Sequence, residues 1–199
     1  MREITADVVV LCLPFTILRH IELRLPLPAV KRRAIQELGY GTNAKVILGF
    51  RNRVWRSQGF GGDSYVDLPY QSGWDSSREQ DSSFGAYTMF AGGNAGLDYG
   101  KGTTLHQART MLTGLDQVFP GVKQDWRGTA LRAFWPDNEF VRGSYAAYRP
   151  GQWTRLRGAE GETVENLYFA GEHTSLDWQG YMNGGAESGR LAAEAILTR

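Results

Sequence analysis

The sequence predicts an α+β protein with two parts, one built around its own mixed sheet and one that contributes only part of an α/β sheet. Residues 7–13, DVVVLCL, form a continuous apolar run, which is typical of a strand covered on both faces. Such a strand needs neighbouring strands and covering helices, so we expect further protein beside it. Residues 44–50 (AKVILGF) and 86–93 (AYTMFAGG) are also strand-like, and a helical pattern follows at 103–121.

The predicted helices have recognisable end signals. Pro28 suits the first turn of a helix that stops at Gly39, with apolar residues on one stripe. The residues of this stripe are Val30, Ala34, Ile35 and Leu38. Thr103 or Thr104 caps the next helix, which ends before Pro120. We expect loops with short strands over 57–84 and a further strand at 130–135 (ALRAFW).

A strand at 166–171 (NLYFAG) and a helix at 180–198 close the chain, and the helix carries a stripe of small residues. Gly185, Gly189 and Ala193 are four apart and share one face, flanked by Ala186 and Ser188. Such a face allows close approach to a sheet or to a ligand. The first turn also offers unpaired amides and the positive end of the helix dipole, where an electron-rich group is stabilised. Plain packing of helix on sheet explains the stripe equally well.

Composition excludes several function classes. The 199 residues include 22 basic and 21 acidic side chains, so there is no basic footprint for nucleic acid. No apolar stretch approaches the ~18 residues that span a bilayer, and we expect no membrane partner. Cys12 is the single cysteine, which is compatible with a reducing compartment, and we expect a cytoplasmic location. The three histidines, His20, His106 and His173, are too scattered to predict a metal site.

Glycine and aromatic residues are abundant. Glycine accounts for 25 residues, and aromatic residues make up 12% of the chain, with six tryptophans. Together they suggest close backbone approaches and a pocket walled by flat rings, although ordinary loops and core packing would also account for them.

Three stretches resemble the FAD-dependent amine oxidase family, which includes monoamine, polyamine, putrescine and L-amino-acid oxidases. Residues 166–196, NLYFAGEHTSLDWQGYMNGGAESGRLAAEAI, resemble its C-terminal flavin-binding segment. Residues 6–55 resemble the segment in which the chain leaves the FAD domain for the substrate domain, and residues 134–152 resemble its return. The resemblance implies an FAD-domain segment at 1–20, a substrate-binding domain at 21–135 and a C-terminal FAD-domain segment at 136–199.

One part of the family pattern is missing from this sequence. Family members begin with the G-x-G-x-x-G strand-turn-helix that holds the ADP half of FAD, and no such motif occurs here. The chain therefore resembles the rear portion of an amine oxidase, without the N-terminal dinucleotide-binding half. We expect it to be inactive and to hold no stable FAD without that half. Its partner would be the missing half, supplied as a separate chain, or a second copy of itself.

The resemblance implies a reaction and a set of site residues. An amine or amino acid would give a hydride equivalent to flavin N5, and O2 would then reoxidise the flavin, forming imine and H2O2. Lys45 matches the lysine that reaches N5 through a water, although a solvated outer-face lysine is the ordinary alternative. Tyr145 and Tyr181 match the two rings that flank the substrate amine. Because Ser144 rather than a cysteine precedes Tyr145, we expect non-covalent FAD.

Further residues match family positions around the cofactor. Trp135 matches a tryptophan near the flavin, and Trp178 is expected to line the substrate pocket, with core packing as the alternative for each. Gly171 and Glu172 match a pair near the ribityl and pyrophosphate groups. Gly180, Tyr181 and Met182 match the helix start, where the Met182 amide faces the flavin C2 carbonyl.

Other activities and the substrate stay open. Glu172–His173 has no third residue that would complete an acid–base site, and the absence of G-x-S-x-G disfavours a serine hydrolase. The alternatives are a non-catalytic binding or interaction module and a related desaturase or protoporphyrinogen-type oxidase. Candidate groups for a substrate carboxylate are Arg142 and Arg149; candidate groups for a second amine are Asp75, Glu79 and Asp177.

Overall fold

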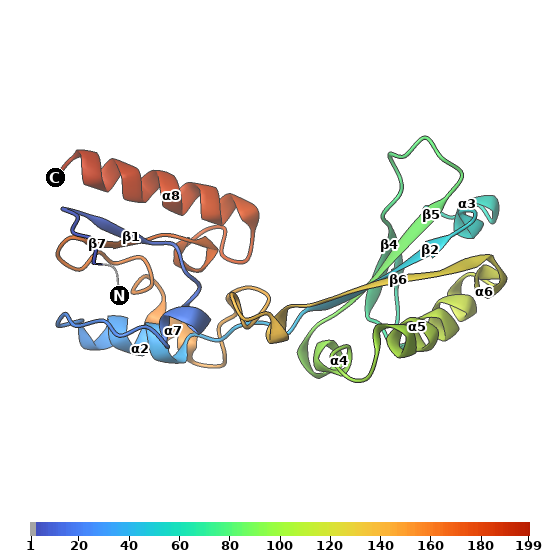
Figure 1. The fold of residues 1–199 in the computed structure, drawn as a ribbon, viewed down its shortest axis with the longest axis horizontal. Coiled ribbons are helices and arrows are strands. Elements are labelled where there is room, and N and C mark those ends of the chain that lie inside the picture. The colour runs from blue at the N-terminus through green and yellow to red at the C-terminus, as the bar shows by residue number, and fades with distance from the viewer. Residues whose placement is uncertain (1–2) are drawn as a thin grey trace. The chain divides into compact units, whose positions relative to one another are not determined.

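The computed structural model describes residues 3–199, which form two compact units (Figure 1). The first unit combines the two ends of the chain, residues up to Gly41 and Glu139–Arg199, and the second unit is the continuous stretch Thr42–Asn138. Within residues 3–199, no helix is long and apolar enough to cross a membrane.

The second unit is a five-stranded sheet with helices on one face, in strand order β3-β4-β5-β2-β6 (Figure 1). Every neighbouring pair in it is antiparallel, so the expectation of a mixed sheet is wrong. The strands are β2 Ala44–Phe50, β3 Ser64–Tyr65, β4 Ser72–Asp75, β5 Gly85–Ala91 and β6 Trp126–Phe134. The helices are α3 Val54–Ser57, α4 Gly93–Asp98, α5 Thr104–Val118 and α6 Val122–Asp125, followed by the 3₁₀ turn η1 Trp135–Asp137.

The core of the second unit follows from the two sequence periods. Alternate residues of β2 are buried, because successive strand side chains point to opposite faces. Helix α5 contributes residues three and four apart on one face: Ala108, Met111, Leu112 and Leu115. Of the two predicted caps for this helix, Thr103 is the one observed, and its hydroxyl accepts a hydrogen bond from the His106 amide at 3.1 Å.

The first unit contains a two-stranded parallel sheet with helices around it. Strand β1 (Val9–Leu11) pairs with β7 (Leu167–Phe169) in the register Val9 to Leu167. The helical elements are α1 Phe15–Leu18, α2 Ala29–Glu37, α7 Gln152–Leu156, the 3₁₀ turn η2 Glu172–Thr174 and α8 Met182–Leu197. Its core gathers Phe15, Leu18, Ala34, Ile35, Leu38, Leu156 and Phe169.

Several predicted boundaries differ from the structure. The apolar run at 7–13 forms only the three-residue strand β1, and Val9 and Val10 are 42% and 41% exposed rather than covered on both faces. Residues 21–41, expected in the substrate domain, lie in the first unit, because α2 packs with α1 and α7. Val30 is exposed, unlike the rest of its predicted stripe.

Helix α8 packs on a different face from the one predicted. Its buried residues are Gly184, Ser188 and Ala192, each one position before the predicted stripe. A Cβ added at Gly184 would lie 2.2 Å from the Trp178 carbonyl oxygen, whereas one added at Gly185 or Gly189 would meet nothing within 4 Å. The predicted stripe is therefore an open face of this chain.

Candidate functional site

Glu172 joins two chain segments of the first unit. It begins the 3₁₀ turn after β7, and its Oε1 accepts a hydrogen bond from the Ala146 amide at 2.9 Å. Its Oε2 accepts another from the Gly180 amide at 2.6 Å. Burial raises the pKa of Glu172, and these two amide bonds oppose that rise. The carboxylate therefore links the segment before α7 to the loop before α8.

Three aromatic side chains lie on the two segments that Glu172 joins. Tyr145 precedes Ala146, and Tyr181 follows Gly180. Gly180 has φ +86°, and a Cβ added there would lie 3.5 Å from Cδ2 of Tyr145, so this ring packs against the glycine. The Trp178 and Tyr181 rings meet edge to face, with centroids 6.5 Å apart. We call Tyr145, Trp178 and Tyr181 the aromatic cluster.

The aromatic cluster is open to solvent. Tyr145, Trp178 and Tyr181 are 38%, 49% and 68% exposed. The alternative of core packing therefore does not hold for these residues in this chain, nor for Trp135, which is exposed in the second unit. Large aromatic rings that are exposed together are typical of binding surfaces, whereas rings that stabilise a fold are packed in its core.

The loop that carries Trp178 is fixed to helix α8. The Trp178 amide donates to Ser175 Oγ at 2.9 Å, and this hydroxyl donates to Glu187 Oε2 at 2.5 Å. Tyr181 is the N-cap residue in extended conformation, and α8 begins at Met182. The Met182 amide therefore belongs to the first helical turn, where no intrahelical carbonyl faces it. The side chain of Met182 is almost fully exposed.

Gly171 is required by packing inside the chain. It has φ +138°, and a Cβ there would lie 2.5 Å from Cε1 of His173. Its amide donates to Ser188 Oγ at 2.9 Å, and the same hydroxyl approaches its carbonyl at 3.0 Å. These contacts hold the end of β7 on α8. A contact of Gly171 with a cofactor stays a prediction.

His173 is buried and does not form an acid–base pair with Glu172. Its ring packs on Phe15 with centroids 4.5 Å apart, and within residues 3–199 its Nε2 has no hydrogen-bond partner. Burial lowers its pKa to about 4, and the nearby Lys31 charge acts in the same direction. Both Glu172 oxygens already accept backbone amides, so neither group is placed for proton transfer to the other.

In the second unit, Lys45 lies on the face of the sheet opposite the core. It is partly exposed between its strand partners Phe90 and Ala133. Its Nζ is 5.8 Å from the Trp74 ring centroid and 5.9 Å from that of Phe90. Sequence reasoning missed both rings. The alternation of β5 around buried Met89 could have placed Phe90 on the outer face, whereas nothing local pointed to Trp74.

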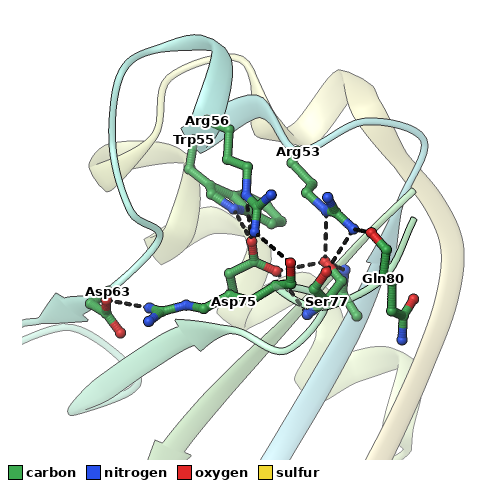
Figure 2. A network of polar contacts seen from close by, with 9 residues as sticks. Arg53, Trp55, Arg56, Asp63, Asp75, Ser77 and Gln80 are labelled. Carbon is green, nitrogen blue, oxygen red and sulfur yellow. Dashed lines mark hydrogen bonds and ion pairs between the residues drawn. The ribbon is translucent and has the colours of Figure 1, made fainter. Parts of the chain in front are cut away.

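Asp75 has a structural role, which removes it as a candidate for amine recognition. Figure 2 shows its carboxylate within a polar network of the second unit. One oxygen accepts from the Ser77 amide and hydroxyl at 2.8 and 2.6 Å, and the other from Trp55 Nε1 at 3.0 Å and Arg56 Nε at 3.1 Å. Burial opposes ionisation, but these bonds outweigh it and hold the pKa of Asp75 below its usual range.

Arginines extend the same network to the neighbouring loop. Arg53 Nη2 donates to the carbonyl oxygens of Ser77 and Gln80 at 2.6 and 2.8 Å (Figure 2). Arg78 pairs with Asp63. The network therefore folds residues 75–80 onto α3.

The remaining substrate candidates lie at the surface. Glu79 and Asp177 are exposed, as are Arg142 and Arg149. Arg142 has φ +48°, and its Nη1 lies 2.8 Å from His20 Nε2. Glu79 belongs to the second unit, whereas Asp177 directly precedes Trp178 of the aromatic cluster in the chain.

The first unit thus presents an open aromatic cluster beside the start of a long helix, and the second unit is built on an antiparallel sheet. The profile of the family described as "Flavin containing amine oxidoreductase" matches residues 1–197, and the chain belongs to that family.

Two of its curated relatives are named as amino-acid oxidoreductases. The chain is 28% identical over 196 residues to the putative L-amino-acid oxidase YobN of Bacillus subtilis, covering 96% of this chain and 41% of the relative. It is 26% identical to the L-amino acid dehydrogenase of Synechocystis, covering 86% of this chain and 36% of the relative. The chain thus spans about two fifths of the length of these relatives.

Solved structures support the same fold. The cyclohexylamine oxidase of Brevibacterium oxydans superposes with a TM-score of 0.87 at 23% identity, covering 96% of this chain and 43% of that one. Putrescine oxidase bound to putrescine superposes with a TM-score of 0.86 at 20% identity, with the same coverage.

Proposed function

We propose that this chain supplies the substrate-domain sheet and the closing part of the flavin site of an FAD-dependent oxidase of amines or L-amino acids. The aromatic cluster, fixed by Glu172 and left open at the start of α8, is the observation that carries this proposal. The products would be an imine and H2O2, as the resemblance to the family implies. A cytoplasmic location is part of the same proposal.

The residues present fit the ring part of FAD. The exposed first turn of α8 offers amide donors and the positive end of the helix dipole, and flat side chains stand beside it. The sequence has no G-x-G-x-x-G loop to hold the diphosphate. We therefore propose that stable FAD binding needs a dinucleotide-binding half in addition to residues 1–199.

When bound, FAD would accept the hydride equivalent from the carbon next to the amine and pass the electrons to O2. Tyr145 and Tyr181 would present ring faces to the amine and exclude water around it. The Met182 amide would donate a hydrogen bond to the flavin ring edge, and Trp178 would wall the pocket. Lys45 and Trp135 keep the roles that the family resemblance implies.

Flavin retention is the first test. We expect the 199-residue chain, mixed with excess FAD and desalted, to be colourless. Co-expression with the part of the Bacillus subtilis relative that precedes the matched region should give a yellow complex. A yellow protein from the chain alone would contradict the requirement for a second half.

Oxidation by the yellow complex is the second test. With a panel of amines and L-amino acids, peroxidase-coupled detection should show H2O2 that depends on one substrate class. Tyr181→Ala should lower kcat/KM by about tenfold, because a cation–π contact contributes roughly 0.5–2 kcal/mol. Tyr65→Ala, at an exposed tyrosine of the edge strand β3, is the control.

The role of Lys45 separates the oxidase from its rivals. Lys45→Met should slow reoxidation of the reduced flavin by O2, whereas Lys123→Met, on the short helix α6, should not. Unchanged reoxidation would remove the proposed role of Lys45. A complex that binds FAD but forms no H2O2 with any amine or amino acid would instead favour the binding module or the desaturase.

A further inference from the structure

We propose that Glu172 is a positioning residue that sets the spacing of the Tyr145 and Tyr181 rings, rather than a ligand of the cofactor. The inference deepens the proposed function, since it concerns what holds those rings in place. It depends on that function only in assuming that the Tyr145 and Tyr181 rings flank a substrate. The arrangement itself can be tested without flavin.

The carboxylate has a separate oxygen for each ring-bearing segment. Oε1 takes the amide of Ala146, the residue after Tyr145, and Oε2 takes the amide of Gly180, the residue before Tyr181. The two amides are 34 positions apart in the chain but are bound to the same side chain. A carboxylate accepts such paired donors well, because both of its oxygens carry the negative charge.

Each segment is otherwise bonded to its own surroundings. The Tyr145 carbonyl accepts from the Gly41 amide at 2.8 Å, and the Ala147 amide donates to the Gly39 carbonyl at 2.9 Å. On the other side, the Tyr181 amide donates to the Trp178 carbonyl at 3.1 Å. These bonds shape each segment separately, whereas the Glu172 carboxylate connects one to the other.

The Tyr145 ring also borders the loop that carries Tyr181. A Cβ added at Gly180 would lie 3.5 Å from Cδ2 of Tyr145, so a shift of this loop would move Tyr181 relative to the Tyr145 ring. Both Glu172 oxygens are directed at backbone amides of the chain. A ribose or ribityl hydroxyl would have to share them, which is why we assign the carboxylate to the protein.

The first experiment needs no substitution. In the ¹⁵N-labelled 199-residue chain, the amide shifts of Ala146 and Gly180 should titrate with one common midpoint, because both report the charge of Glu172. The amides of Gly41 and Gly184, which bond to Tyr145 and Tyr181 carbonyls, should not follow that midpoint. Independent midpoints for Ala146 and Gly180 would overturn the proposal.

The second experiment uses Glu172→Gln. Glutamine has the same length but only one accepting oxygen, so one of the two amides loses its partner. Hydrogen exchange at Ala146 or Gly180 should accelerate by about tenfold, and the nuclear Overhauser contact between the Tyr145 ring and Gly180 should weaken. Glu172→Asp keeps the charge but is one methylene shorter, so it should not keep slow hydrogen exchange at both the Ala146 and the Gly180 amide.

The matched control is Glu187→Gln. Glu187 accepts a hydrogen bond from Ser175, whereas the amides of Ala146 and Gly180 donate to Glu172. Its substitution should leave exchange at those two amides unchanged. If Glu172→Gln folds, keeps slow exchange at both amides and keeps the ring contact, the proposal is wrong.

The outcomes separate this proposal from the proposed function. If Glu172→Gln lowers flavin retention in the yellow complex while both amides and the ring contact stay as in the wild type, Glu172 is a cofactor ligand and the proposed oxidase still stands. If the complex oxidises no amine but the amides titrate together, the positioning role stands and the oxidase fails.

Discussion

The two units of this chain build their interiors in different ways. The second unit is one continuous stretch whose antiparallel strands cover a complete core, with Leu48, Trp55 and Leu115 wholly buried. The first unit draws on both ends of the chain and has a parallel pair with Val9 and Val10 exposed. Antiparallel sheets can have one face open to water, whereas parallel strands need cover on both faces.

The two units also differ in how many hydrogen bonds their buried ionisable side chains make. In the second unit, the buried Asp75 carboxylate accepts four hydrogen bonds. In the first unit, Lys31 is buried beneath the Phe169 ring with one bond to the Glu160 carbonyl, and His173 is buried beside it. The exposed aromatic cluster belongs to the first unit as well. Within residues 3–199 each unit also buries one polar atom without a hydrogen-bond partner, Tyr99 Oη in the second and His173 Nε2 in the first. The contrast between the units therefore lies in their buried charged groups and in the exposed rings of the first unit.

The sharpest contrast should come from two tryptophans. Trp55→Ala in the second unit should cost about 3–5 kcal/mol of unfolding free energy, because it empties the core between Phe50, Tyr87 and Phe119 and removes a donor to Asp75. Trp178→Ala in the first unit should cost less than about 1 kcal/mol. Denaturant unfolding followed by circular dichroism measures both, and equal costs would break the comparison.

Acid should destabilise the first unit through His173. Its pKa is lowered to about 4 in the folded state, so the unfolded state binds more protons between about pH 6.5 and 4. Stability is unaffected by this group at pH 7 and falls as the pH drops through that window, by about 3 kcal/mol in all.

His173→Gln tests the acid effect, because it removes the titration while keeping a polar side chain. The variant should lose less stability between pH 7 and pH 4.5 than the wild type. His106→Gln, at an exposed histidine of the second unit, should leave the wild-type pH profile unchanged. A profile of His173→Gln that parallels the wild type would assign the acid sensitivity to other groups.

Local signals in the sequence are sufficient to predict much of the secondary structure of the second unit. Strand β2 has the predicted bounds, and α5 begins at its predicted cap, because both depend on residue periodicity and on Thr103. Strand direction carries no such signal, which is why a mixed sheet was expected where the sheet is antiparallel. The membership in a flavin amine oxidoreductase family, expected from the motif at 166–196, is confirmed by the profile match.

The first unit was harder to predict, because its site depends on contacts between distant residues. Nothing near Glu172 indicates that its carboxylate binds amides at 146 and 180, and the expected place of Glu172 beside the cofactor stays a prediction. The packed face of α8 was missed for a similar reason. Small residues occupy several faces of that helix, and the Trp178 carbonyl selects the one at Gly184.

Alanine substitutions at two glycines of α8 test which face of the helix is packed, and they have the smallest expected effects on stability. Gly184→Ala would place a Cβ 2.2 Å from the Trp178 carbonyl oxygen and should destabilise by about 1–3 kcal/mol, since backbone must move. Gly189→Ala meets nothing within 4 Å and should stabilise the helix by up to about 1 kcal/mol. Thermal unfolding of the pair measures both signs. If Gly189→Ala destabilises the protein, the face of α8 that carries Gly189 is covered in solution. The difference between the two glycines would then depend on a partner bound to the first unit.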